Sequence, residues 1–329
     1  MKILRSIISP QSIAQIVSKD YGISSQNIRC ELLKAGGSND VYLIKYFNKK
    51  FVVKLYSNRQ CWPYLQENFL LETEIMDFLY NHGIILPKLI LNLEHSFVSK
   101  IQAPEYDKYY TLCSYIQGTH HDNLTPDYKR LFYLGQSLAF LHNSSKRFVP
   151  SNNFNRKIDL RFLLHDPKNR INKVANISNK LLMQLNKLYD DLCNKFEELD
   201  YDNLPSGIIH GDMHSGNHKY IRSRHQILFL DFELCGLGWN IYDLAVFRWN
   251  LFFLDSIKSR DKAWKSFFNG YTSINELTNM EYNAIELFVK IRHFFFLGST
   301  TIIYPDASAY NNTRFIQNIY NMIDGFVMP

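Results

Sequence analysis

The sequence predicts an α+β fold in two parts, a small N-terminal part with an antiparallel sheet and one helix and a larger, mainly helical C-terminal part. Short strand-like apolar runs fill the first third of the chain, and longer runs with apolar residues at helical spacing follow them. A chain of 329 residues also exceeds one average domain, so its length favours two units. We expect the N-terminal part to span residues 1–113, a connection to span 114–118 and the helical part to span 119–329.

A glycine-rich turn is the first expected feature, at residues 34–39. Its Gly36, Gly37 and Ser38 are common turn residues, and the segment lacks the full Gly-x-Gly-x-x-Gly pattern. Taken alone, these three residues therefore predict only a hairpin turn.

Two strands are expected after this turn, at residues 41–44 and 51–56. In the second strand Val53 and Leu55 alternate with Lys54. Because successive side chains of a strand point to opposite faces, Lys54 should point away from the face that carries Val53 and Leu55.

A helix and a further strand complete the N-terminal part. Apolar residues recur at helical spacing through residues 69–79, and this helix carries two glutamates, Glu72 and Glu74. The apolar segment 110–118 reads as a strand that ends at a glycine, which suits a connection to the second part and would equally suit an edge strand with a turn.

The C-terminal part shows long helical patterns. Residues 131–142 have leucines on one helical face, and residues 181–199 carry acidic residues on the opposite, solvated side. Aromatic residues recur at helical spacing through 245–328, and the segment 291–298 is expected to be a core helix. No apolar run reaches the ~18 to 20 residues that a membrane span requires.

The strongest chemical signal lies in residues 208–243. Asp212 and Asn217 are five positions apart, and Asp231 follows the short apolar run 227–230, which suits a buried strand. Transfer of a phosphoryl group from ATP to a hydroxyl requires a carboxylate beside the attacking oxygen and oxygen ligands for the metal ions. These three side chains could supply all of those groups.

A zinc site is the alternative interpretation of the same stretch. His210, His214 and His218 recur at intervals of four, which would place them on one face of a helix. Gly211 and Gly216 argue against that helix, since two glycines so close together weaken it and favour a loop. A zinc site would also leave the later Asp-Phe-Glu sequence unexplained.

The pattern His-Gly-Asp-x-His-x-Gly-Asn followed by Asp-Phe-Glu resembles the signature of the aminoglycoside phosphotransferase and choline kinase-like family, relatives of the protein kinases. The resemblance implies a bilobal protein kinase-like fold. By motif position, Asp212 would be the catalytic base, Asn217 and Asp231 the Mg²⁺ ligands, His210 a support of the loop and Asp243 its anchor from the following helix. One departure is local, because His218-Lys219-Tyr220 stands where the family has apolar residues, and this leaves the length of the next strand open.

The same resemblance gives roles to the N-terminal part. A kinase needs a phosphate-covering turn, a lysine strand, a helix with a glutamate that pairs with the lysine, and a hinge whose backbone binds adenine. The family's spacing to later apolar, Gly and Pro positions favours Glu72 as the partner of Lys54, with Glu74 as second choice. The residues expected to bind ATP are Gly36, Gly37, Ser38, Lys54, Glu72, Ser114, Tyr115 and Ile116.

Composition sets outer limits on function. The net charge of +6 comes from basic residues spread along the chain, so a nucleic-acid partner is not expected. The five cysteines form no Cys-x-x-Cys pair and read as free thiols, and the apolar stretch at the N-terminus is too short for a signal peptide. We therefore expect a cytoplasmic protein without a membrane partner.

The expected function is an ATP-dependent and Mg²⁺-dependent phosphotransferase that acts on a hydroxyl of a small molecule. The acceptor classes found in the family are aminoglycosides and other antibiotics, amino alcohols, homoserine and hydroxylysine, and Glu233 could face the acceptor. The patterns at 52–56 and 72–87 are most similar to the homoserine kinase and stress-response kinase branches. A Ser/Thr protein kinase and a nucleotide-binding module without turnover stay as alternatives, and the sequence predicts no oligomeric state.

Overall fold

The computed structural model describes residues 6–35, 39–56, 66–120, 126–151, 156–174, 177–253, 257–303 and 313–321. The chain forms two compact units, Met1–Gln117 and Gly118–Pro329. The turn residues Gly36, Gly37 and Ser38 lie outside the described residues.

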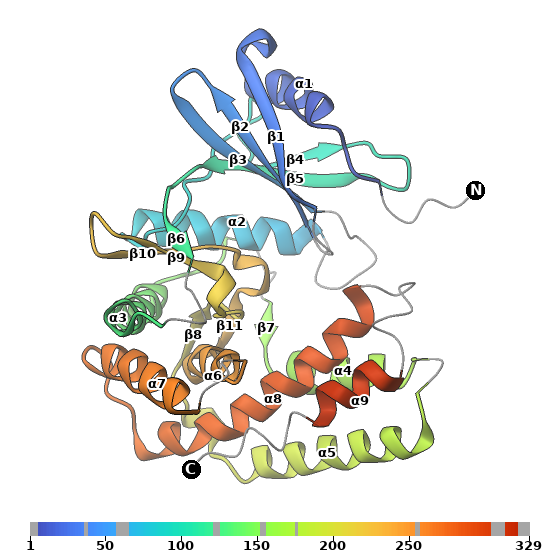
Figure 1. Cartoon of the computed structure of the whole chain (residues 1–329), viewed down its shortest axis with the longest axis vertical. Coiled ribbons are helices and arrows are strands. Elements are labelled where there is room, and N and C mark those ends of the chain that lie inside the picture. Colours follow the sequence, from blue (N-terminus) through green and yellow to red (C-terminus); the bar gives the residue numbers. More distant parts are fainter. Residues whose placement is uncertain are drawn as a thin grey trace. The chain divides into compact units, whose positions relative to one another are not determined.

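The first unit is built on a five-stranded antiparallel sheet with the order β1-β2-β3-β5-β4 (Figure 1). Its strands are β1 (Ile28–Ala35), β2 (Asn39–Tyr46), β3 (Lys49–Tyr56), β4 (Val98–Ile101) and β5 (Lys108–Ser114). The expected strand pattern of β3 is confirmed, because Val53 and Leu55 are fully buried in the core of this unit while Lys54 is only partly buried. The helix expected at 69–79 is α2 (Gln66–Asn81).

A second helix of this unit, α1 (Pro10–Tyr21), adds to the single helix that the sequence predicted. The Ser9 side chain accepts a hydrogen bond at its start, and Gly22 ends it in the left-handed conformation at φ 64°. Ile13 and Val17, one helical turn apart, are buried in the same core as β2 and β3. These caps and the apolar pair are visible in the sequence and explain the helix.

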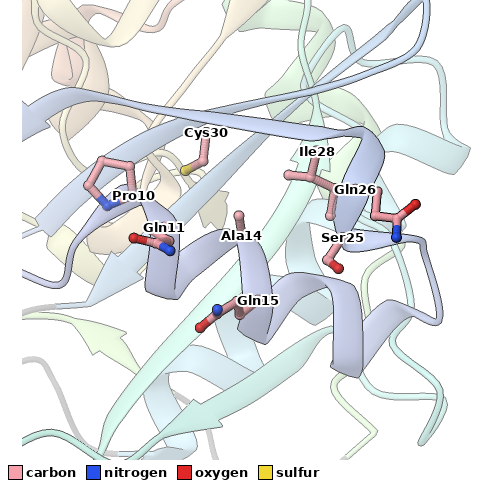
Figure 2. Close-up of a pocket in the computed structure, with 8 residues that line it drawn as sticks. All are labelled: Pro10, Gln11, Ala14, Gln15, Ser25, Gln26, Ile28 and Cys30. Atoms are coloured by element: carbon pink, nitrogen blue, oxygen red, sulfur yellow. The ribbon is translucent and has the colours of Figure 1, made fainter.

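A hollow lies beside α1 and β1 (Figure 2). Gln11, Ala14 and Gln15 of α1 line one side, and Gln26 and Cys30 lie across from them. The lining contains amide, hydroxyl and apolar groups but no charged side chain, and none of it was expected to bind ATP. We therefore assign this hollow no part in phosphate binding.

The second unit is mainly helical (Figure 1). Its helices are α3 (Tyr128–Ser145), α4 (Asp166–Ile171), α5 (Asn179–Glu197), α6 (Asn240–Leu251), α7 (Ile257–Thr272), α8 (Asn279–Ile303) and α9 (Thr313–Asn321). Two small sheets have the orders β10-β9-β6 and β7-β11-β8, with strands β6 (Thr119–His120), β7 (Lys157–Ile158), β8 (Ser206–Ile209), β9 (His218–Ile221), β10 (Gln226–Phe229) and β11 (Gly236–Trp239).

Helices α6 and α8 pack against each other in this unit. Every residue of α6 except Asn250 is buried, and α8 also packs against α4 and α5. The expected core segment 291–298 lies within α8. Among the described helices, none has an apolar stretch long enough to cross a lipid bilayer.

A buried histidine of α8, His293, connects two other helices. The indole N–H of Trp249 in α6 donates to its Nδ1 at 3.1 Å, and its Nε2 donates to the Ile319 carbonyl of α9 at 2.7 Å. The neutral ring therefore uses both nitrogens, Nδ1 as an acceptor and Nε2 as a donor. Burial lowers the pKa of His293 from 6.5 to about 4, and the hydrogen bond to Ile319 offsets only part of this.

We expect the second unit to lose stability in mild acid because of His293. The unfolded chain binds a proton on this ring below about pH 6.5 and the folded chain only near pH 4, so the stabilisation is present above pH 6.5 and is lost as the pH falls towards 4. The full difference between these two pKa values corresponds to about 3 kcal/mol in the free energy of unfolding. Urea unfolding across this range should show a shallower acid dependence in His293→Gln than in the wild type. The exposed His82 supplies the control, and an equal effect of His82→Gln would refute the assignment.

Candidate active site

The lysine of the first unit forms a shielded ion pair. The Lys54 Nζ lies 3.0 Å from Oε1 of Glu72, and the two side chains are 16% and 3% exposed. Of the two glutamates considered from the sequence, Glu72 therefore makes this contact. The pair fixes the ammonium of Lys54 beside the Tyr56 ring, whose centroid lies 4.8 Å from Nζ.

Three residues at the end of β5 and just after it were expected to bind adenine. Two of them use their backbone N–H groups for hydrogen bonds within the protein. The Ser114 N–H donates to the Lys88 carbonyl at 2.8 Å, and the Tyr115 N–H donates to the Lys50 carbonyl at 3.1 Å. Within the described parts of the chain, Ile116 makes no backbone hydrogen bond. Ile116 is thus the residue of the three whose peptide groups are best placed to accept a new partner.

In the second unit, one buried carboxylate holds the loop that follows β8. Asp243 of α6 accepts hydrogen bonds from the backbone N–H groups of His210 and Gly211, both at 2.8 Å. His142 of α3 donates its Nε2–H to the same carboxylate at 3.0 Å, and the Tyr271 hydroxyl of α7 lies 2.8 Å from the other ring nitrogen. Three helices therefore fix the backbone of the loop through Asp243.

Gly211 has a conformation and a position that only glycine fits. Its φ is +79°, and a Cβ there would lie 2.1 Å from the Leu234 carbonyl oxygen. The neighbouring His210 donates its Nε2–H to the Leu230 carbonyl at 2.9 Å, and its Nδ1 accepts the Asp212 N–H at 3.3 Å. The loop is thereby joined to the end of β10.

Asp212 lies in this loop with both carboxylate oxygens engaged. Arg292 of α8 donates to Oδ1, the Asn217 amide donates to Oδ2 at 3.1 Å, and His214 Nε2 lies 3.4 Å from Oδ2. Burial alone would raise the pKa of Asp212, but Arg292 and His214 hold it well below its usual range. Burial likewise opposes a charge on His214, yet the Asp212 carboxylate raises the pKa of that ring. Asp212 is therefore an ionised carboxylate.

Asn217 and Asp231 offer oxygen ligands suited to Mg²⁺. The Asn217 amide nitrogen donates to the Asp212 carbonyl and carboxylate, which leaves its Oδ1 oxygen for a cation. The Leu230 N–H donates to the Asn217 carbonyl at 2.8 Å, so Asp231 follows directly on a residue bonded to Asn217. Asp231 has a positive φ of 57° and an exposed side chain. This donor set fits a Mg²⁺ ion that would also bind phosphate oxygens.

The histidines of this stretch do not form a zinc site. His210 bonds to a backbone carbonyl, His214 faces Asp212, and the buried His218 begins β9. No group of three or more His, Cys, Asp and Glu side chains suited to a metal occurs in the part of the chain that the structure describes. The unusual His218-Lys219-Tyr220 sequence forms most of β9, where His218 and Tyr220 are buried and Lys219 lies on the outer side.

Several partners of the loop were not assigned from the sequence. Arg292 contacts Asp212, His142 contacts Asp243, and the Asn250 side chain of α6 accepts the Ser215 N–H at 2.9 Å. His214, which belongs to the sequence motif but was given no role in it, lies beside the Asp212 carboxylate. The contacts of Arg292 and Asn250 join the loop to distant helices, and that of His142 joins α3 to α6. Local spacing in the sequence does not signal these contacts. Glu233 is half-buried just past Asp231.

An ionised carboxylate, an amide oxygen beside it and a second carboxylate at the end of a strand are the parts of a phosphoryl-transfer site, and a lysine paired with a helix glutamate occurs in the other unit. Together with a sheet unit followed by a helical unit, these features define the class of kinase-like phosphotransferases. Residues 29–277 match the model of the phosphotransferase enzyme family, and the chain belongs to that family, the aminoglycoside phosphotransferase and choline kinase-like family of the resemblance. The chain is therefore a phosphotransferase.

Relatives agree with this membership. The amicoumacin kinase of Bacillus subtilis is 22% identical over 312 residues, which cover 90% of this chain and 86% of the relative. A solved amicoumacin kinase in complex with AMP-PNP, Ca²⁺ and Ami has a TM-score of 0.75 at 18% identity, covering 97% of this chain and 94% of that chain. The microcompartment-associated aminopropanol kinase also has a TM-score of 0.75, at 20% identity and 95% coverage of both chains. The predicted kinase-like fold is confirmed.

Proposed function

We propose that this protein transfers the γ-phosphoryl group of Mg-ATP to a hydroxyl of a small molecule. The observation that carries the proposal is the arrangement of Asp212, Asn217 and Asp231 around one loop, because it combines a fixed carboxylate with oxygen ligands for a cation. The Lys54–Glu72 pair supports ATP as the donor, since a lysine held in this way binds nucleotide phosphates in kinases.

In this reaction Asp212 accepts a hydrogen bond from the acceptor hydroxyl and orients its oxygen for in-line attack on the γ-phosphorus. The proton passes to Asp212 as the bond to phosphorus forms and the bond to the leaving ADP oxygen breaks. Asn217 and Asp231 would hold Mg²⁺, which neutralises phosphate charge when bound. Lys54 binds the phosphates, and the peptide groups of Ile116 bind adenine.

The small-molecule acceptor is supported by the activities for which the relatives are named. The amicoumacin and aminopropanol kinases each cover nearly all of this chain, and both are named for a small-molecule substrate. We infer an acceptor with an accessible alcohol group. Glu233 is proposed to face it, because this residue follows the metal-binding Asp231 within one turn.

A panel assay tests the function. Mg-ATP consumption should be measured with aminoglycosides, amicoumacin, 1-amino-2-propanol, ethanolamine, homoserine, hydroxylysine and a Ser/Thr protein acceptor. Turnover of one small-molecule class supports the proposal. Phosphorylation of the protein acceptor alone would favour a protein kinase, and stabilisation by Mg-ATP without any turnover would indicate a nucleotide-binding module.

Removing the lysine charge should weaken ATP binding. In Lys54→Met we expect the Kd for Mg-ATP to rise about tenfold or more, the scale of a lost charge-assisted hydrogen bond. Isothermal titration calorimetry measures this directly. Lys49→Met, at an exposed position of the same strand, is the matched control and should bind like the wild type. Equal affinities of all three proteins would exclude Lys54 from the ATP site.

A further inference from the structure

Arg292 is a buried cation placed next to the proposed catalytic carboxylate. It lies on α8, is 4% exposed and donates through Nη2 to Oδ1 of Asp212. Its guanidinium carbon lies 5.1 Å from the ring centroid of Trp249 and 5.4 Å from that of Phe295. The two aromatic rings restrict the guanidinium, so its position relative to Asp212 is fixed by the helix core.

Arg292 completes a set of contacts that leaves the Asp212 carboxylate one orientation. Oδ2 is held by the Asn217 amide at 3.1 Å and approached by His214 at 3.4 Å, and both residues belong to the same loop as Asp212. Among the described residues, Arg292 is the one from outside that loop that donates to Oδ1. Without it, the carboxylate could rotate while the loop backbone stayed in place, because rotation of an Asp carboxylate about its terminal bond is soft.

Arg292 has more hydrogen-bond donors than the described residues around it accept. Its Nε and Nη1 are buried, and neither has a hydrogen-bond partner in the described residues. A buried arginine with unused donors is costly to the fold. Arg248 shares this cost at its Nε, so the contact with Asp212 is what distinguishes Arg292. If Arg292 served packing alone, an apolar side chain at this position would pack equally well against Trp249 and Phe295.

We propose that Arg292 is a positioning residue for phosphoryl transfer, which holds Asp212 in the orientation that receives the acceptor hydroxyl. The inference rests on the proposed function of Asp212. It assigns to α8 a task in the reaction that lies outside the sequence motif. Since Arg292 acts through Asp212, its loss should affect turnover and leave nucleotide affinity nearly unchanged.

Arg248 provides a matched control within the same unit. It is also a buried arginine, 9% exposed, with its guanidinium carbon 4.5 Å from the ring centroid of Trp264. Its pKa is lowered by burial to about 10, and it belongs to α6, the helix that also carries Asp243. If both buried arginines only supported the fold, Arg292→Met and Arg248→Met would therefore have similar effects on turnover.

The first experiment compares kcat and the KM for ATP in these variants, using the acceptor found in the panel assay. We expect kcat to fall about 10- to 100-fold in Arg292→Met, the range seen when a residue that orients a functional group is removed. Arg292→Lys should recover part of kcat, and Arg248→Met should turn over like the wild type. An unchanged kcat in Arg292→Met, or an equal loss in Arg248→Met, would overturn the proposal.

A double variant shows whether Arg292 acts through Asp212. Adding Arg292→Met to Asp212→Asn should cause little further loss of kcat, because the group that Arg292 orients has already been altered. Two independent, multiplying losses would contradict positioning and indicate a separate role.

Nitrogen NMR of the arginine side chains separates this inference from the proposed function. Asp212→Asn should shift the Arg292 guanidinium signals and leave those of Arg248 in place. If the wild type turned over no acceptor, the proposed function would fail. The spectrum would still test whether Arg292 and Asp212 are in contact. Unchanged Arg292 signals would show that the two side chains do not interact and would end the inference.

Discussion

Replacing Asp212 by asparagine should leave Mg-ATP binding nearly intact while turnover falls about 10²- to 10⁴-fold, the contribution of a general base. The asparagine side chain has nearly the same shape and its oxygen can still accept from Arg292. Its amide nitrogen cannot accept from Asn217 as Oδ2 does, and the side chain cannot take a proton from the acceptor. The structure makes the change local, because the loop backbone is held by Asp243 and not by Asp212. Coupled measurement of ADP release gives kcat, and calorimetry gives the affinity for Mg-ATP.

Asp191→Asn makes the same chemical change at an exposed position of α5 and serves as the control. It should match the wild type in both measurements. Unchanged turnover in Asp212→Asn would mean that the acceptor is oriented by another group, and the proposed function of the loop would have to be abandoned. A parallel loss of ATP affinity would instead indicate that the substitution disturbs the nucleotide site.

The parts of the site that were predictable from the sequence are those set by local spacing. The alternation in β3 places Lys54 on the face opposite Val53 and Leu55, and the two glycines around Asp212 define a loop. Helix α1 was not predicted, although Ser9 and Gly22 mark its two ends. Only two of its 12 residues, Ile13 and Val17, are buried, so its apolar pattern is weaker than that of a core helix such as α6.

The supporting contacts were not predictable, because they join residues far apart in the chain. Arg292 and Asp212 are separated by 80 positions, and His142 and Asp243 by 101. Arg292 and His142 lie on helices, and the spacing of apolar residues along a helix shows only which side of it is buried. A buried charge on such a helix signals a partner without saying which one, and only the folded arrangement of α3, α6, α8 and the loop after β8 brings the pairs together.

Replacing Asp243 by alanine should affect both the fold and the reaction. The change removes the acceptor of three buried hydrogen bonds, from His210 N–H, Gly211 N–H and His142. Each buried donor left without a partner costs about 1–3 kcal/mol. We expect the free energy of unfolding to fall by about 3–5 kcal/mol, the cost of breaking a buried charged network. Urea unfolding followed by tryptophan fluorescence measures the loss.

Two milder variants separate folding from loop geometry. Asp243→Asn keeps an acceptor oxygen for one backbone N–H, and Tyr271→Phe removes only the hydroxyl that contacts His142. Tyr271→Phe should therefore cost about 1 kcal/mol, as for a single buried hydrogen bond. If Asp243 acts on the reaction through the loop, Asp243→Asn should lose kcat under conditions where it is fully folded, while Tyr271→Phe should retain most of it. Full activity of folded Asp243→Asn would show that the loop keeps its geometry without the carboxylate, and the residue would then be needed for stability alone.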